Sequence, residues 1–266
     1  MSSYIHGYSA REHQRLQDQA ATLADLLHSD TLYPNSSSIL EVGCGVGAQT
    51  VTLAQRNPTA IIRAIDIHEP SLRIAEASCR AAGLTNVQFQ HADLFASPLA
   101  MASFDHAMVC FVLEHLREPV GALKVVAQHV RAGGTLTIIE GDHGSAFFHP
   151  DSAPARRVID CQVHLQAIAG GSTNIGRMLY PLLKNAGFSA ISVSPRMIYV
   201  DGNRPQLVDG FTRDTFIAMI EGIRPTAVDA GLITAAEFDL GIRDLRRTLE
   251  PDGVFSYTFF KAVAVV

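Results

Sequence analysis

The chain has 266 residues, of which 47% are hydrophobic, so it can bury a substantial core as one large domain or as one domain with an appended lobe. Its formal charge is −5, and its lysines and arginines are scattered or occur in short pairs such as Arg156 and Arg157. Because binding to a phosphate backbone requires clustered positive charge, this composition argues against a nucleic-acid partner. The high apolar content also excludes a disordered chain.

The first half of the sequence alternates helical and strand-like patterns. Apolar residues at helical spacing between Glu12 and Leu27 predict an N-terminal helix that leads into the main fold. The segments that follow are predicted as strand 38–42, helix 48–55, strand 61–67, helix 70–82, strand 87–91, strand 106–111, helix 119–130 and strand 135–140. Since parallel strands require crossover connections, the alternation predicts an α/β fold with a Rossmann-like, doubly wound and mostly parallel sheet.

The second half is predicted to complete this sheet and to add a helical insertion. Helical patterns cover residues 153–169 and 176–186, a strand covers 189–200, and an antiparallel strand closes the chain. Residues 201–252 are mostly helical and too long for a bare connection, which predicts a lid or substrate lobe. The expected organisation is an N-terminal helical arm at 1–35, a core formed by 36–200 and 253–266, and the inserted lid at 201–252.

Cysteine spacing and the N-terminal segment bear on the cellular compartment. Four cysteines are widely spaced without a C-x-x-C motif, and the first residues lack the basic-then-apolar order of a signal peptide. No apolar run reaches the length of a membrane span. We therefore expect a cytoplasmic protein without a membrane segment.

A glycine-rich segment, ILEVGCGVGAQT, follows the first apolar strand at residues 39–50. Gly43, Gly45 and Ala48 match the spacing of a dinucleotide-binding loop, in which a helix N-terminus meets the ligand. Asp66 lies about twenty residues further on, at the end of the second strand, where a carboxylate can accept hydrogen bonds from ribose hydroxyls. Its alternative role is to cap the next helix.

Two further residues favour a cationic adenosine ligand over a dinucleotide. Glu41 directly precedes the loop, and Gly47 adds a third position at which the backbone can approach a ligand closely. A carboxylate would repel a pyrophosphate and attract an ammonium or a sulfonium.

Five ordered segments resemble the class I S-adenosylmethionine-dependent methyltransferases: LEVGCGVGAQT, IDIHEPSLRIAEA, VQFQHADLFASPL, FDHAMVCFVLEHL and RAGGTLTIIEGDHGS. The resemblance implies S-adenosylmethionine as cofactor and S-adenosylhomocysteine as product. It places Asp66 at the ribose, Ile67 beside the adenine, and Asp93 at the adenine amino group. The other cofactor-binding residues implied are Glu41, Gly43, Gly45, Gly47 and Gln49 around the methionine part, Leu94 beside Asp93, and Cys110 and Phe111 at the sulfonium.

The N-terminal stretch YIHGYSAREHQRL and the motif EGDHGS further resemble a bacterial and archaeal subgroup related to small-molecule methylating enzymes, including an indole methyltransferase. Tyr4, Tyr8 and Arg11 precede the first helix. Tyr8 is a candidate to close over the cofactor, where a ring face attracts a sulfonium, and Arg11 is a candidate partner for the methionine carboxylate. Tyr4 is assigned to the substrate. An arm that merely packs on the sheet is the alternative for all three.

Methyl transfer needs mainly alignment of two reactants in a dry pocket, and it needs a base only when the nucleophile must lose a proton. His143 is the first catalytic candidate, because it is predicted to follow strand five at the carboxyl edge of the sheet, where ligands bind in such folds. A solvent-facing loop histidine is the alternative. His115, after strand four, is the second candidate and could instead be a packed core histidine; Glu140 and Asp142 are acidic alternatives.

The position after strand four also bears on other methyltransferase chemistries. Metal-dependent catechol methyltransferases would carry an acid there, where this chain has Cys110 and Phe111, so no metal is expected although His143, His149 and Asp142 could form a site. The Asn/Asp-Pro-Pro-aromatic stretch typical of methyltransferases that act on DNA bases or glutamine is missing too. Substrate contacts beyond His143 and Tyr4 are predicted from the residues after strand five, namely Gln162, Gln166, Arg177, Tyr199 and Phe216.

The sequence therefore predicts a methyltransferase that acts on a small molecule at nitrogen, oxygen or an electron-rich carbon such as that of an indole. Three alternatives remain at this stage: methylation of RNA or protein, a nicotinamide-dependent oxidoreductase, and a non-catalytic cofactor-binding scaffold. The lid helices would also allow a homodimer, since such lobes often leave apolar faces exposed.

Overall fold

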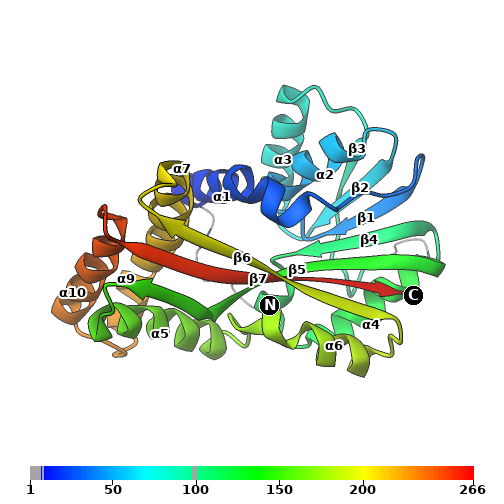
Figure 1. Cartoon of the computed structure of the whole chain (residues 1–266). Helices are drawn as coiled ribbons and strands as arrows, with labels where there is room; N and C mark the ends of the chain where they lie inside the picture. The colour runs from blue at the N-terminus through cyan, green and yellow to red at the C-terminus, as the bar shows by residue number, and fades with distance from the viewer. Residues whose placement is uncertain (1–6, 8, 98–100) are drawn as a thin grey trace.

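A seven-stranded mixed sheet forms the centre of the molecule in a computed structural model that describes residues 7, 9–97 and 101–266 (Figure 1). The strand order is β3-β2-β1-β4-β5-β7-β6, and only β7 runs antiparallel to its neighbours. The strands are β1 (Ser38–Val42), β2 (Ile61–Asp66), β3 (Val87–His91), β4 (Phe104–Cys110), β5 (Val130–His149), β6 (Ile191–Asp201) and β7 (Val254–Val265). The predicted Rossmann-like α/β fold with an antiparallel C-terminal strand is confirmed.

Helices cover both faces of this sheet because its central strands are apolar on both sides. Along β1, Ile39 packs in the cluster that contains residues of α1 (Ala10–His28) and α2 (Ala48–Arg56), whereas the next residue, Leu40, packs in the cluster of α4 (Pro119–His129) and α6 (Leu179–Ala186). Figure 1 shows α1, α2 and α3 (Glu69–Ala81) on one side and α4 and α6 on the other.

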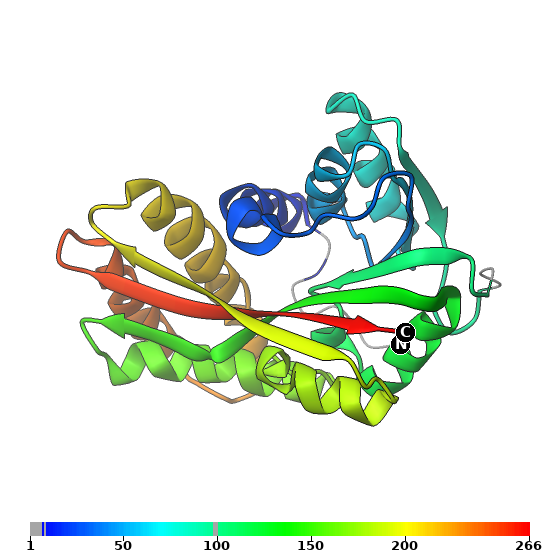
Figure 2. The ribbon, with the colours of Figure 1, turned by 45° about the vertical axis from the view of Figure 1, so that its right-hand side comes forward.

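Strand β5 is much longer than the sequence pattern predicts. The pattern predicts a strand that ends at Glu140, with His143 in the segment after it, whereas β5 continues to His149. Its partner β7 accounts for the difference, since the two strands pair from Thr135 and Val265 to His149 and Val254, with an irregularity between Asp142 and Phe147. His143 therefore lies within a strand. Figures 1 and 2 show β5, β6 and β7 extending together beyond the parallel part of the sheet.

A helical lobe packs around this extension. It consists of α5 (Ala153–Ile168) and the helices between β6 and β7, which are α7 (Pro205–Leu207), the π-helix η3 (Val208–Ile217), α8 (Ala218–Gly222), α9 (Arg224–Asp229), α10 (Ala235–Arg246) and the 3₁₀ turn η4 (Arg247–Leu249). Two other 3₁₀ turns, η1 (Leu113–His115) and η2 (Ile175–Met178), follow β4 and α5. The expected division assigned residues 153–169 to the core, but α5 packs closely on α10 of the inserted segment. That the insertion acts as a lid stays a prediction.

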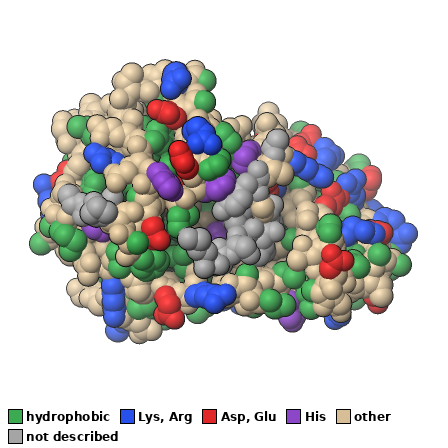
Figure 3. Space-filling view, turned by 180° about the vertical axis from the view of Figure 1, so that it is seen from behind, with side chains coloured by type: hydrophobic (Ala, Val, Ile, Leu, Met, Phe, Trp, Pro, Cys, Tyr) green, Lys and Arg blue, Asp and Glu red, His purple; other side chains and the backbone are tan. Residues whose placement is uncertain are grey.

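No helix among the residues that the structure describes is long and apolar enough to cross a membrane. On the face shown in Figure 3, acidic and basic side chains are interspersed. A basic stripe is not seen on that face.

A buried lysine ties β7 to the segment that connects α1 to β1. Lys261 is 3% exposed, and its Nζ donates hydrogen bonds to Asp30 Oδ1 at 2.6 Å and to Thr31 Oγ1 at 2.7 Å. Burial lowers the pKa of Lys261, and the Asp30 carboxylate opposes that shift. The Asp30 carboxylate therefore compensates the buried charge of the Lys261 ammonium, and the Thr31 hydroxyl adds a hydrogen bond.

We expect Asp30→Ala to destabilise the protein by about 1–3 kcal/mol, because it leaves the Lys261 ammonium buried without its carboxylate. Lys261→Met, which removes the charge and keeps an apolar stem, should cost less. Urea unfolding of the two variants and the parent measures the difference. A Lys261→Met variant that is as unstable as Asp30→Ala would show that the buried charge is not the cause.

Candidate active site

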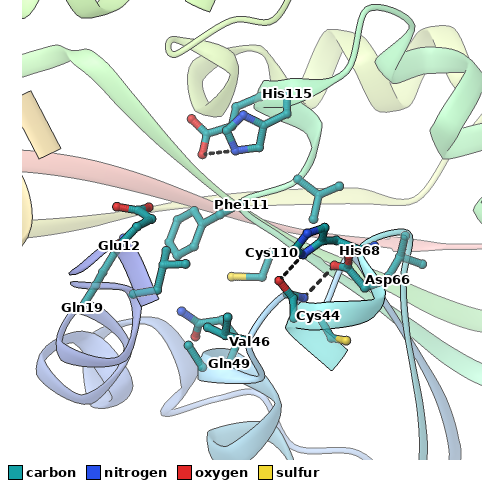
Figure 4. A pocket seen from close by; sticks show the side chains of 18 of the residues that line it. Glu12, Gln19, Cys44, Val46, Gln49, Asp66, His68, Cys110, Phe111 and His115 are labelled. Carbon is teal, nitrogen blue, oxygen red and sulfur yellow. Dashed lines mark hydrogen bonds and ion pairs between the residues drawn. The ribbon is translucent and has the colours of Figure 1, made fainter. Parts of the chain in front are cut away.

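A cavity of about 650 Å³ lies at the carboxyl ends of β1, β2 and β4. Residues of α1 and of the π-helix η3 also contribute to its walls. In Figure 4, Asp66 and the pair Cys110 and Phe111 face the same space from the ends of β2 and β4, and Glu12 and Gln19 face it from α1. The position agrees with the rule that open α/β sheets bind ligands at the carboxyl ends of their strands.

The glycine loop after β1 forms one wall of this cavity. Gly43 and Gly45 have φ angles of 71° and 53°, in the left-handed region that favours glycine. A Cβ at Gly43 would lie 2.5 Å from Val112 Cγ2, so this position also excludes a side chain on steric grounds. The loop therefore brings bare backbone to the cavity surface.

Gly47 has a different role from the one predicted. It is not among the residues that line the cavity; it is the N-cap of α2, with φ of 78°. A Cβ there would lie 2.8 Å from the Ala75 Cα on α3. The close packing of α2 on α3 therefore requires this glycine.

Asp66 lies at the end of β2 and lines the cavity. Its Oδ2 accepts a hydrogen bond from the Gly45 N–H at 2.7 Å, and its Oδ1 accepts one from the His68 N–H at 2.7 Å. These bonds fix the carboxylate between the glycine loop and the start of α3, and each oxygen retains a lone pair for a ligand hydroxyl. The N-cap of α3 is His68, so Asp66 does not cap that helix.

Glu41 is the buried acid of the site. It is 2% exposed, lines the cavity, and its Oε2 has no hydrogen-bond partner among the described residues. Burial, with a further contribution from the Asp66 carboxylate, raises the pKa of Glu41 to about 7. A buried carboxyl oxygen without a partner is costly, so this position is suited to a ligand that donates hydrogen bonds or carries positive charge.

The remaining residues implied for the cofactor lie along the same wall. Ile67, Asp93, Leu94 and Gln49 all line the cavity. Asp93 Oδ1 accepts a hydrogen bond from the Phe95 N–H at 2.8 Å, which fixes the loop after β3. Gln49 Oε1 lies 2.8 Å from His28 Nε2, so α1 holds that side chain in place.

The backbone turns sharply after β4, where Cys110 and Phe111 reach the cavity. Phe111 has φ of 57°, an uncommon conformation for a bulky residue, and its N–H donates to the Ile139 carbonyl at 2.9 Å. Buried Glu140 holds the next residues, since its Oε1 accepts from the N–H groups of Val112 and Leu113 at 3.0 and 2.7 Å. Glu140 therefore supports this turn from behind and does not line the cavity.

His143 lines the cavity from β5 and is 7% exposed. Its backbone N–H donates to the Thr173 carbonyl, its Nδ1 lies 3.0 Å from the Tyr257 hydroxyl, and its Nε2 has no partner among the described residues. Burial lowers the pKa of His143 and so favours the neutral imidazole. His143 is therefore not a solvent-facing loop residue.

His115, the second catalytic candidate, also lines the cavity. Its Nδ1 lies 2.8 Å from Gln166 Nε2, which also donates to the Glu114 carbonyl at 2.8 Å. Its Nε2 lies 3.6 Å from a carboxylate oxygen of Glu114, another cavity residue. Gln166 thus contacts the site through His115 and does not line it.

Several predicted residues lie away from the cavity or outside the described part of the chain. Arg177 forms a bidentate ion pair with Asp142 at 2.7 Å for both contacts, which also occupies that acid. Arg11 lies 3.5 Å from Glu221, Gln162 is buried within α5, and Tyr199 is 38% exposed on β6. The cavity lining includes Phe216 but not Arg11, Asp142, Gln162, Arg177 or Tyr199. Tyr4 and Tyr8 lie outside the described residues.

Cavity residues on α1, on η3 and α8 of the lobe, and on β7 are not predicted from the sequence. Glu12 and Arg15 form a buried bidentate ion pair, with contacts of 2.6 and 2.7 Å, at the wall formed by α1. One sequence feature could have indicated these residues, because Glu12 and Gln19 fall on the apolar stripe of the helix, where a polar side chain is expected to be buried. From the lobe and β7, the additional residues are Phe211, Thr215, Met219, Tyr257 and Phe259.

Among the described residues, no three histidine, cysteine or acidic side chains are placed together to hold a metal ion. Two of the three residues considered for a metal site have protein partners instead: His143 contacts Tyr257, and Asp142 pairs with Arg177.

The geometry agrees with comparisons to known proteins. Residues 39–134 match the family model described as a methyltransferase domain. The chain is 31% identical over 202 residues to the O-methyltransferase cnsE of Penicillium expansum, covering 73% of this chain and 68% of that protein. The chain therefore belongs to the class I S-adenosylmethionine-dependent methyltransferases. This membership leaves no support for the nicotinamide-dependent alternative.

Solved structures share the fold at low sequence identity. The YcgJ protein of Bacillus subtilis matches with a TM-score of 0.60 and 14% identity, over 92% of this chain and 97% of that one. The [4+2]-cyclase SpnF matches with a TM-score of 0.54 and 20% identity, over 89% and 78% of the two chains. The chain spans only 24% to 54% of the length of three other curated relatives that it matches.

Proposed function

We propose that the protein transfers a methyl group from S-adenosylmethionine to a small-molecule acceptor, at nitrogen, oxygen or an electron-rich carbon such as that of an indole. The observation that carries this proposal is one cavity that joins the glycine loop and Asp66 to a group of aromatic rings that includes Phe111, Phe216 and Phe259. The bound cofactor would supply an electrophilic methyl group on a sulfonium. The chain would align the acceptor with that methyl group and exclude water.

The residues present fit this cofactor. Glu41 offers an unpartnered buried oxygen to a cationic group, and the loop at Gly43 and Gly45 admits a ligand close to its backbone. Asp66 retains acceptor capacity on both oxygens for the two ribose hydroxyls, while Asp93 and Leu94 lie where the adenine is expected. The product, S-adenosylhomocysteine, would occupy the same part of the cavity.

A small acceptor is favoured over RNA or protein because the far end of the cavity is lined by the buried rings of Phe211, Phe216 and Tyr257. The name of cnsE, an O-methyltransferase, supports oxygen as one acceptor atom. Because a neighbour with this fold is a [4+2]-cyclase, the fold alone does not define the reaction. A cytoplasmic location and a homodimer remain predictions.

The test is incubation of the purified protein with methyl-deuterated S-adenosylmethionine and separated metabolite, RNA and protein fractions of the source cells, followed by mass spectrometry. We expect the label in a small metabolite. Label in RNA or protein would replace the proposed substrate class. Cofactor binding without label in any fraction would instead support a scaffold.

A further inference from the structure

The end of the cavity beyond the cofactor wall is built from aromatic rings that touch one another. The Phe111 and Phe259 ring centroids are 5.8 Å apart, those of Phe259 and Tyr257 are 4.7 Å apart, and Phe216 lies 5.7 Å from Tyr257. All four rings line the cavity. Such a wall offers edge and face contacts to a flat aromatic ligand, each of which adds to the free energy of simple apolar burial.

His143 adds a buried imidazole to this aromatic wall. Its ring centroid lies 6.0 Å from that of Phe216 and 5.7 Å from that of Tyr257, and its Nε2 is a buried nitrogen without a partner among the described residues. Since an unsatisfied buried nitrogen is costly, a ligand atom that hydrogen-bonds to Nε2 is the expected partner.

Tyr257 and Gly141 determine how the imidazole is held. The Tyr257 hydroxyl lies 3.0 Å from His143 Nδ1, and a Cβ at Gly141 would lie 2.4 Å from the same hydroxyl oxygen. The first glycine of the EGDHGS motif therefore makes room for the tyrosine. Because a hydroxyl can donate or accept, Tyr257 can accept from a protonated Nδ1 and leave the Nε2 lone pair directed toward a ligand that donates a proton.

We propose, on the basis of the function proposed above, that the methyl acceptor is a phenol: a flat aromatic molecule that packs on the Phe111, Phe216 and Phe259 rings and presents its hydroxyl to His143 Nε2. In the reaction, the phenol oxygen forms the new bond to the methyl carbon, the C–S bond breaks with its electron pair going to sulfur, and the phenol proton passes to Nε2. Tyr257 is the positioning residue. The Glu114 and Asp142 carboxylates favour the imidazolium that forms.

Two other acceptor classes fit these residues less well. An alkyl ammonium, with an ordinary pKa near 10.4, arrives with its lone pair occupied by a proton and must be desolvated among aromatic rings before it can react. An aliphatic alcohol is far less acidic than a phenol, whose ordinary pKa is near 10, and a buried neutral imidazole is a weak base. A phenol enters uncharged and retains a lone pair for attack while its proton is still bound.

The first test is binding, which does not depend on turnover. We would titrate 4-methoxyphenol and its saturated match, 4-methoxycyclohexanol, into the protein loaded with S-adenosylhomocysteine and follow the heat. The phenol is expected to bind at least about tenfold more tightly, from ring contacts and the Nε2 hydrogen bond. Equal affinities, or no binding of either compound, would overturn the assignment. Failure to bind S-adenosylhomocysteine at all would instead contradict the proposed function.

The second test separates proton transfer from packing. In His143→Gln, kcat for 4-methoxyphenol should fall roughly 10²–10⁴-fold, whereas 4-nitrophenol, which is ionised at an assay pH of about 8, should lose much less because it has no proton to transfer. Tyr257→Phe, which keeps the ring, should lower kcat about tenfold with little change in KM. Cofactor affinity and circular dichroism report whether each variant is folded. Equal losses for both phenols, or a metabolite labelled at nitrogen, carbon or an aliphatic oxygen, would contradict the proposal.

Discussion

Replacing Asp66 with asparagine is expected to weaken binding of S-adenosylmethionine about 100-fold, the largest effect that we predict for a single change on cofactor affinity. In the structure, both carboxylate oxygens accept hydrogen bonds from backbone N–H groups, those of Gly45 and His68. Asparagine has one acceptor oxygen, so its amide NH₂ must face one of these two donors. The variant therefore loses the anchored loop and the charge-assisted hydrogen bonds to the ribose together.

Calorimetry of the variant and the parent measures this change. The matched control is Asp160→Asn, which alters an exposed acid on α5 by the same chemistry. We expect the control to bind the cofactor with parental affinity, and both variants to keep the parental circular dichroism. An Asp66→Asn variant within threefold of the parent would show that this acid does not hold the ribose.

Local sequence patterns were sufficient to predict those parts of the fold that are stabilised by contacts between residues close together in the sequence. The first strands and the glycine loop follow from short apolar runs and from glycines at positive φ, and Asp66 could be located because β2 ends beside β1. The role of Gly47 could not be predicted from local sequence. A glycine next to a binding loop suggests contact with a ligand, but the atoms that exclude a side chain at this position belong to Ala75 on α3.

The aromatic end of the cavity could not be predicted in the same way, because distant segments build it. His143 was expected in a loop, and it lies in a strand because β7, more than a hundred residues further on, extends the pairing of β5. Phe216 is one substrate candidate among several in the sequence, and Phe259 is not among them. Only the folded structure shows that Phe216 of η3 and Phe259 of β7 both line the cavity.

Polar residues on a helix pose a related problem. Glu12 and Arg15 match the pattern of an exposed ion pair three residues apart. They are buried because α1 packs across the carboxyl edge of the sheet, where its N-terminal half faces the cavity. Arg11, one turn earlier, was the expected partner of a ligand carboxylate, and its side chain is directed to Glu221 instead. The rotation of α1 about its own axis thus determines that Arg15 lines the cavity and that Arg11 does not.

Affinity for S-adenosylmethionine should rise with pH because of Glu41. This carboxyl is buried, and its pKa is raised to about 7 in the ligand-free protein. Only its ionised form attracts a cationic ligand, and the fraction ionised increases as the pH rises through that pKa. Between about pH 6 and 7.5, where the ligand's amino group remains mostly protonated, we expect the dissociation constant to fall roughly tenfold. Binding near the midpoint should release a proton, which calorimetry in two buffers of different ionisation enthalpy detects.

Glu41→Gln separates this acid from other titrating groups. The amide keeps the shape of the side chain and cannot ionise, so the variant should bind the cofactor about 30- to 100-fold more weakly at pH 7.5 and lose most of the pH dependence. If the variant keeps the full pH slope, a group other than Glu41 is responsible, and Glu41 then remains protonated beside the bound cofactor and acts as a neutral hydrogen-bonding group.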